Sequence, residues 1–156
     1  MSDKNKSWPD LSGHLEGGEH VLPVRIYYED TDFSGIVYHA SYLRFMERGR
    51  SDMLRLCDIH HSELDAGRTG ERLAFVVRHM DINFLKPARI DDVLEIRTRC
   101  SSVQGARMIM EQQVVREGQV LIEAKVTAAV INPQGRPRRM PAELAVRLGV
   151  GLSRDG

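Results

Sequence analysis

The sequence has no excess of charge of either sign, few cysteines and no long apolar run. Its 22 Lys and Arg residues balance 22 Asp and Glu residues, so no overall field favours nucleic acid or an anionic membrane. The two cysteines, Cys57 and Cys100, have no metal-ligand spacing and are expected to be free thiols. No window approaches a membrane span, and residues 1–20 contain no apolar signal core. We therefore expect a cytoplasmic protein with no nucleic-acid partner and no membrane insertion.

Several catalytic and binding motifs are also absent. No serine lies in a Gly-x-Ser-x-Gly elbow, which disfavours a serine hydrolase, and no glycine-rich phosphate loop is present. His60 and His61 have no cysteine or acidic residue at ligand spacing around them, so no metal site is predicted.

Length and patterning predict a single domain. A chain of 156 residues can bury one sizeable core, which we place over 21–150. Residues 1–20 are polar, contain three glycines and show no periodicity, so they are predicted to form a flexible tail.

The pattern changes from a strand to a helix in the first half of the domain. Apolar residues alternate over 21–30, which predicts a half-buried strand. A helical stripe then runs over 38–57, with Gly49 inside it. Glycine costs a helix about 1 kcal/mol relative to alanine, and close approach to a sheet would explain its presence.

The second half is mostly strand. Strands are predicted over 73–85, 93–100, 106–116 and 120–130, followed by a short helix over 141–148. Short connections between consecutive strands favour antiparallel pairing. The predicted fold class is α+β, with a curved antiparallel sheet of about five strands wrapped round one long helix.

The link between the first strand and the long helix is the most informative segment. Asp32 lies in a tight turn, and His39 lies near the helix start. The first N–H groups of a helix lack intrahelical partners and can hold a developing oxyanion. A carboxylate beside such donors suits hydrolysis of an acyl group.

Two stretches of this sequence resemble the hotdog-fold acyl-CoA thioesterases of the 4-hydroxybenzoyl-CoA thioesterase family, and are most similar to the branch associated with the bacterial Tol–Pal system. The matching residues are Arg25-Ile26, Thr31-Asp32, Gly35-Ile36-Val37, Tyr42 and Phe45, then Phe75-Val76-Val77-Arg78, Phe84, Pro87 to Asp92 and Leu94-Glu95-Ile96. The resemblance runs from about residue 24 to residue 148.

The resemblance implies an active site at the turn. Asp32 would be catalytic, either as a base that activates water or as a nucleophile that forms a mixed anhydride. The N–H groups near Tyr38 and His39 would polarise the thioester carbonyl, and the His39 side chain would orient the carbonyl or water. Gly35 would allow the sharp turn into the helix. Partial burial of Asp32 would raise its pKa.

The resemblance also implies substrate contacts and an assembly. Phe75 and Val76 would line the acyl and pantetheine channel, and Arg107 would contact the phosphates of coenzyme A. The other candidates for phosphate contact are Lys86, Arg89, Arg136, Arg138 and Arg139. Coenzyme A is part of the substrate, and no separate cofactor is implied. Family subunits join their sheets edge to edge, which predicts a homotetramer with active sites between subunits. Acyl carrier protein is a further candidate partner.

Other interpretations of these residues stay open. Asp32 could be only a turn or capping residue, and His39 could be a surface histidine. Asp30, the neighbouring carboxylate, is expected to tie the turn together, and Glu47 to be a solvated helix residue. At the level of function, the fold could serve as an acyl-binding docking module for acyl carrier protein or envelope-lipid machinery, or carry hydratase chemistry.

Overall fold

The computed structural model describes residues 13–59, 64, 71–149 and 152–153; His60, His61 and the part of the predicted tail over 1–12 lie outside this range. The elements are β1 (His14–Glu16), β2 (Glu19–Arg25), the 3-10 turn η2 (Tyr28–Asp30), α1 (His39–Leu56), β3 (Ala74–Phe84), β4 (Val93–Gln104), β5 (Arg107–Arg116), β6 (Gln119–Ile131), α3 (Ala142–Arg147) and β7 (Leu152–Ser153). None of the helices in the described ranges is long and apolar enough to cross a membrane.

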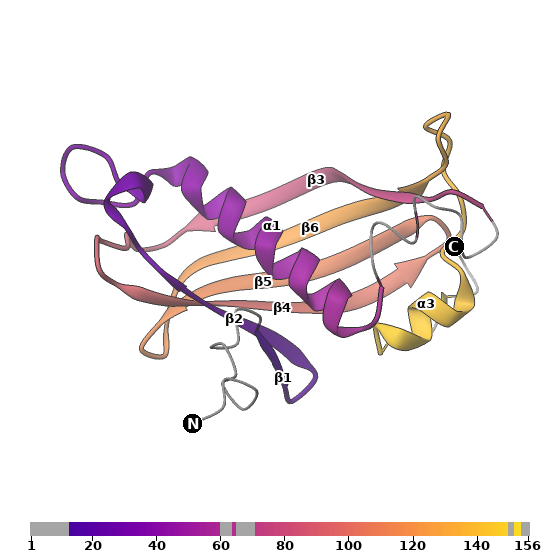
Figure 1. The fold of residues 1–156 in the computed structure, drawn as a ribbon, viewed down its shortest axis with the longest axis horizontal. Coiled ribbons are helices and arrows are strands. Elements are labelled where there is room, and N and C mark those ends of the chain that lie inside the picture. The colour runs from indigo at the N-terminus through magenta and orange to yellow at the C-terminus, as the bar shows by residue number, and fades with distance from the viewer. Residues whose placement is uncertain (1–12, 60–63, 65–70, 150–151, 154–156) are drawn as a thin grey trace, which may run out of the picture.

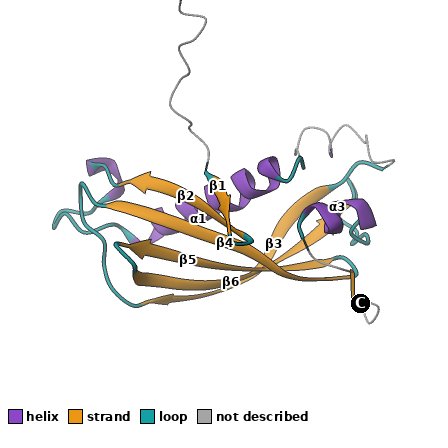
Figure 2. Cartoon of the chain, turned by 90° about the horizontal axis from the view of Figure 1, so that it is seen from below, coloured by secondary structure: helices purple, strands orange, loops and turns teal. Residues whose placement is uncertain are grey.

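The strands form one curved sheet, and α1 crosses one of its faces (Figures 1 and 2). The order is β1-β2-β4-β5-β6-β3, with antiparallel neighbours, and β7 adds to β4 in parallel. The five long strands and the long helix confirm the predicted hotdog architecture. The expectation that consecutive strands pair is wrong for β3 and β4, because β3 pairs with β6 and forms the far edge of the sheet.

The structured chain begins earlier than the boundary predicted for the tail. β1 and β2 form a hairpin in which His14 pairs with Val21, and β2 already begins at Glu19. His20 is fully buried against α1. The tail prediction is therefore wrong for residues 13–20, where a short hairpin is anchored by one buried side chain rather than by an apolar pattern.

The first long strand also ends earlier than the alternation predicted. β2 stops at Arg25, and η2 follows at Tyr28–Asp30. One Asp30 carboxylate oxygen accepts the Tyr27 N–H at 2.9 Å, which closes the turn and takes the chain off the sheet. The alternation over 21–30 would place Tyr28 on the same face as Ile26, yet Tyr28 is 74% exposed and Ile26 is fully buried.

Helix α1 approaches the sheet closely at Gly49, as the glycine in its stripe predicted. A Cβ at Gly49 would lie 2.9 Å from Cγ2 of Ile96 and 3.1 Å from Oγ1 of Thr98. A larger residue would therefore push against the Ile96 and Thr98 side chains below. The apolar core is divided into two clusters, one under the first half of α1 and one under its second half.

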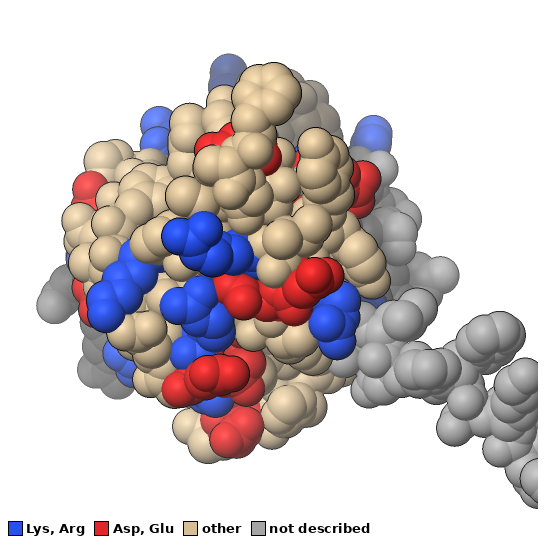
Figure 3. All heavy atoms as spheres, turned by 90° about the vertical axis from the view of Figure 1, so that its left-hand side faces the viewer, with Lys and Arg blue, Asp and Glu red and all other residues tan. Residues whose placement is uncertain are grey.

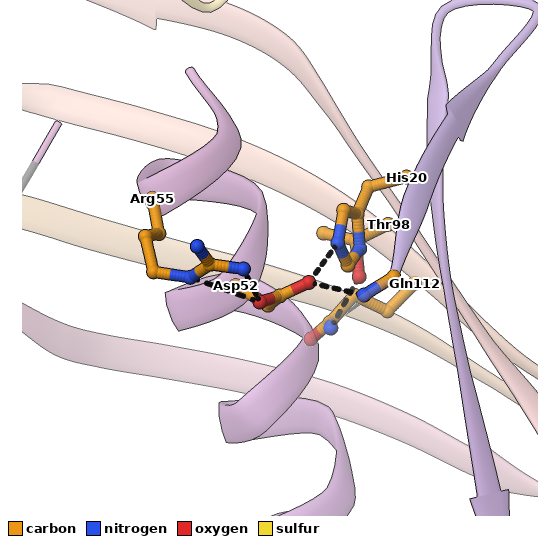
Figure 4. Close-up of polar contacts among 6 residues, drawn as sticks. His20, Asp52, Arg55, Thr98 and Gln112 are labelled. Carbon is orange, nitrogen blue, oxygen red and sulfur yellow. Dashed lines mark hydrogen bonds and ion pairs between the residues drawn. The ribbon is translucent and has the colours of Figure 1, made fainter. Parts of the chain in front are cut away.

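A row of polar residues crosses the sheet below Gly49 (Figure 4). His20, Thr98 and Gln112 are cross-strand neighbours on β2, β4 and β5. Nε2 of His20 lies 2.7 Å from a carboxylate oxygen of Asp52 on α1. The Gln112 side-chain amide donates to Oγ1 of Thr98 at 2.8 Å and to the Met46 carbonyl at 2.9 Å. These bonds fix the middle of α1 to three strands.

Candidate active site

The segment between η2 and α1 is a small closed loop. Thr31 and Val37 form an isolated antiparallel bridge, and Ile36 forms another with Arg89 of the β3–β4 connection. Gly35 adopts φ +80°, and its N–H donates to the Asp32 carbonyl at 3.1 Å. Side chains other than glycine rarely adopt this φ, so Gly35 makes the sharp turn that the sequence predicted.

Asp32 lies at the tip of this loop with its carboxylate exposed to solvent. One carboxylate oxygen, Oδ1, accepts both the Ser34 hydroxyl at 2.6 Å and the Ser34 N–H at 2.8 Å. These two hydrogen bonds, the hydroxyl first, lower the pKa of Asp32 below its ordinary value. The expectation of a partly buried carboxylate with a raised pKa is therefore wrong for the single chain, since local donors stabilise its ionised form.

Asp30 has the structural role that the sequence predicted. Its side chain closes η2, and its backbone carbonyl accepts the Tyr38 N–H at 2.9 Å and the Ser41 hydroxyl at 3.1 Å. The residue is buried. Asp30 thus joins η2 to the first turn of α1 and holds the intervening loop in place.

The start of α1 has fewer free donors than expected. The Tyr38 N–H is used by Asp30, so the expectation that it stays unpaired is wrong. His39 and Ala40 occupy the first turn, where the N–H groups have no carbonyl partner within the helix. A cavity of about 320 Å³ lies beside this turn, and its lining includes Asp32, Tyr38, Ala40 and Ser41. The aspartate and the helix start therefore share one hollow.

Aromatic rings surround this end of α1. The His39 ring lies 6.4 Å from the ring of Phe84, centroid to centroid, in an edge-on arrangement. Phe33 and Tyr28 are fully or largely exposed, and Phe84 is 53% exposed at the end of β3. The partly exposed Phe84 ring and the His39 ring therefore lie side by side at the start of α1. The contact between Phe84 and His39 was not predicted, because it depends on β3 lying at the sheet edge nearest the helix start.

Phe75 and Val76 line a second, smaller cavity. It has a volume of about 100 Å³ and lies between β3 and the second half of α1, with Glu47 and Arg50 on the helix side. Arg107 is close to this region, because Val76 and Arg107 are both paired with Ala129 of β6. The predicted residues thus form two separate groups in one chain, with Asp32, Gly35, Tyr38 and His39 at one end of α1 and Phe75, Val76 and Arg107 towards the other.

The end that carries Asp32 is rich in charge, with Lys and Arg side chains next to Asp and Glu side chains (Figure 3). Lys86 and Arg89 belong to the β3–β4 connection, which bridges to the Asp32 loop. Arg116 is held by Asp92 at 2.8 Å. Of the predicted phosphate contacts, Lys86 and Arg89 therefore lie at the same end as Asp32, whereas Arg107 does not.

Within the described ranges, no cluster of three or more His, Cys, Asp or Glu residues could hold a metal ion.

Comparison with known proteins gives the class of the protein. Residues 34–123 match the model of the thioesterase superfamily, and the chain belongs to that family. The matched range contains His39, Phe75, Val76 and Arg107 and begins just after Asp32.

Particular relatives cover most of the chain. The acyl-CoA thioester hydrolase YbgC of Escherichia coli is 44% identical over 124 residues, which is 78% of this chain and 90% of the relative. The acyl-CoA thioesterase YbgC of Haemophilus influenzae is 39% identical over 79% of this chain and 89% of its own. The crystal structure of a probable thioesterase from Bartonella henselae has 53% identity and a TM-score of 0.76, covering 79% of this chain and 99% of that one.

Proposed function

We propose that this protein hydrolyses acyl-CoA thioesters to a free acid and coenzyme A. The observation that carries the proposal is the shared hollow at the start of α1, where Asp32 lies beside the first helical turn. Membership of the thioesterase superfamily and the similarity to the YbgC proteins support it. No cofactor is needed, because a carboxylate and backbone donors supply the chemistry.

The reaction divides into an attack and a departure. Asp32 either removes a proton from water, whose oxygen attacks the carbonyl carbon, or attacks that carbon itself and forms a mixed anhydride that water then cleaves. The carbon–sulfur bond breaks, and coenzyme A leaves as a thiolate that takes up a proton. Since Ser34 donates to Oδ1, we assign the reacting role to Oδ2. The first-turn N–H groups at His39 and Ala40 stabilise the oxyanion, and the His39 ring orients the carbonyl or the water.

Release of free thiol from a panel of acyl-CoA thioesters tests the proposal. The panel contains short aliphatic, long aliphatic and aromatic acyl groups, and the same acyl groups on acyl carrier protein. Thiol release that is saturable in at least one acyl-CoA is the expected result. Failure to release thiol from any of them by a folded, monodisperse protein would contradict hydrolysis.

Replacing Ser34 by alanine should move the acidic limb of the activity profile to higher pH. The ionised carboxylate is the reactive form, and the lowered pKa of Asp32 keeps it ionised as the pH falls. Loss of the Ser34 hydroxyl removes the first cause of that lowering, so the pKa rises and activity is lost at a higher pH. The measurement is kcat/KM against pH for both proteins, with Ser101→Ala as the matched control. An acidic limb that stays in place or moves lower would show that Asp32 is not the titrating group.

We also propose that two copies join through β3 and assemble further into a tetramer. In the described part of the chain β3 is paired only along β6, and its other edge is open. Val77, near the middle of that strand, is 45% exposed. An open edge with exposed apolar side chains favours pairing with a second sheet. Such pairing would also bring the Phe75 and Arg107 of one copy towards the Asp32 of its neighbour.

Mixing two impaired variants should restore activity if the site is shared between copies. We expect Asp32→Asn and Arg107→Glu each to be impaired alone, the first in kcat and the second in KM for acyl-CoA. In a mixed dimer one of the two sites regains both native residues. Refolding the variants together and measuring thiol release tests this expectation. Activity that never exceeds the sum of the separate variants would mean that each site lies within one copy.

A further inference from the structure

A large groove lies between β2 and α1, apart from the Asp32 hollow. Its volume is about 750 Å³, which is in the range of sites that bind small molecules. Glu29 is the one residue in the lining of both cavities. The apolar part of the groove lining consists of Leu22, Pro23, Val24, Phe45 and Ile59. The proposed reaction uses none of these residues.

The groove has an apolar floor and a charged rim. Leu22 from β2 and Phe45 from α1 are buried and form the floor, together with Ile59 after the helix. The exposed side chains of the lining include the three arginines Arg25, Arg48 and Arg55. A cavity of this composition suits a molecule with an apolar body and a charged group at its surface.

Two of the three arginines have no carboxylate partner within the described ranges. Arg55 is paired with Asp52 at 2.9 Å. Arg25 donates only to a backbone carbonyl, that of Asp91, at 3.5 Å, and Arg48 has neither an ion pair nor a hydrogen bond among the described residues. Arg48 therefore offers an anion a full set of unused donors above an apolar floor.

The carboxylates of the groove are mostly engaged. Asp52 is bonded to His20 as well as to Arg55, and Asp30 accepts the Tyr27 N–H and lies 3.6 Å from Arg44. Glu29 is the one lining carboxylate for which the described residues provide no ion pair. The two unpaired arginines outnumber this single carboxylate, so the rim favours an anionic group.

Pro23 makes the edge of β2 a poor partner for an added strand. From Leu22 to Arg25 the outer edge of β2 has no strand beside it among the described elements. Proline has no N–H to donate, and edge prolines generally protect a sheet from pairing with another chain. A ligand held by apolar contact and charge therefore fits this groove better than an extended peptide.

We propose that the groove binds a single-chain amphiphile with an anionic head group, of the fatty acid class. The tail lies along the apolar floor, and the head group is held by Arg48. This inference does not rest on the proposed hydrolase activity, because the groove and the Asp32 hollow are different surfaces and the test measures binding rather than turnover.

Calorimetric titration of the full-length protein with dodecanoate and with dodecanol tests the site. We expect saturable binding of dodecanoate, tighter than that of the uncharged alcohol. Arg48→Glu should weaken dodecanoate binding about ten-fold or more, because it replaces an unpaired cation by an anion, and leave dodecanol binding unchanged. Val24→Glu places a carboxylate in the apolar lining and should weaken both ligands. Arg136→Glu makes the same change of charge at an exposed position outside the groove and is the matched control for Arg48→Glu.

Several results would overturn the proposal. One is the absence of saturable dodecanoate binding, and another is equal affinity for dodecanoate and dodecanol. An equal effect of Arg48→Glu and Arg136→Glu would mean that only the overall charge of the protein matters. Dodecanoate that is displaced by coenzyme A and unaffected by Val24→Glu would belong to the Asp32 hollow. Circular dichroism melting shows whether each variant is folded.

Discussion

Asp32→Asn is expected to lower kcat for acyl-CoA hydrolysis by about 10²–10⁴-fold, the range typical of losing a positioned base, with little change in the free energy of unfolding. The asparagine carbonyl oxygen can still accept the Ser34 N–H and hydroxyl, which both end on one oxygen of Asp32. The substitution therefore removes the negative charge and keeps the turn. Thiol-release kinetics and urea unfolding measured on the same preparation separate the two effects.

The control for this substitution is Asp81→Asn, a change of the same chemistry on the exposed face of β3. Its kcat should equal that of the unmodified protein. If Asp32→Asn and Asp32→Ala both retained full kcat, Asp32 would be only a turn residue, and another group would have to activate the water.

Gly49→Val is expected to lower the free energy of unfolding by about 2–3 kcal/mol, towards the upper end of the usual cost of overpacking. Even the first added carbon would lie 2.9 Å from Cγ2 of Ile96 and 3.1 Å from Oγ1 of Thr98. Ile96 is a β-branched and fully buried residue of β4, so its methyl group has little freedom to move aside. The better helix propensity of valine offsets only a few tenths of a kcal/mol of this cost. Urea unfolding followed by circular dichroism gives the change.

Glu47→Val is the matched control on the same helix, at an exposed position. There the substitution should alter the free energy of unfolding by only a few tenths of a kcal/mol, through helix propensity. Gly49→Ala should lie between the two valine variants. Equal stability of Gly49→Val and the unmodified protein would show that α1 does not approach the sheet closely at this point.

The elements of the fold could be predicted because their signals are local. Period-two alternation gave the strand over 120–130, and period 3.6 gave α1 nearly to its ends. The end of β2 was missed because Asp30 closes a turn through its side chain, an interaction that alternation does not contain. The pairing of β3 with β6 rather than with β4 was missed for a similar reason, since the choice of partner depends on how the whole sheet closes.

The local geometry around the candidate site residues was predictable only in part. The Asp32 turn and the role of Gly35 follow from short-range geometry. The direction of the Asp32 pKa shift was predicted wrongly, because it is set by the donors of Ser34 and not by burial. The distance between Asp32 and the group containing Phe75 and Arg107 reflects the length of the folded sheet, which local sequence patterns do not give.

The polar row beneath Gly49 also affects the position of the start of α1, at His39. A helix held only by apolar contacts can shift along its axis or rotate about it at little cost in free energy, because such contacts are non-directional. Here Gln112 donates to the Met46 carbonyl, and Asp52 is hydrogen-bonded to His20, so the position of α1 along the sheet is fixed. Gly49 has no side chain and lets the helix lie close to the strands at the same point. His39 lies ten residues away, about 15 Å along the same rigid rod. Because the helix is rigid, the contacts that fix the middle of α1 also determine where its first turn lies relative to the Asp32 loop.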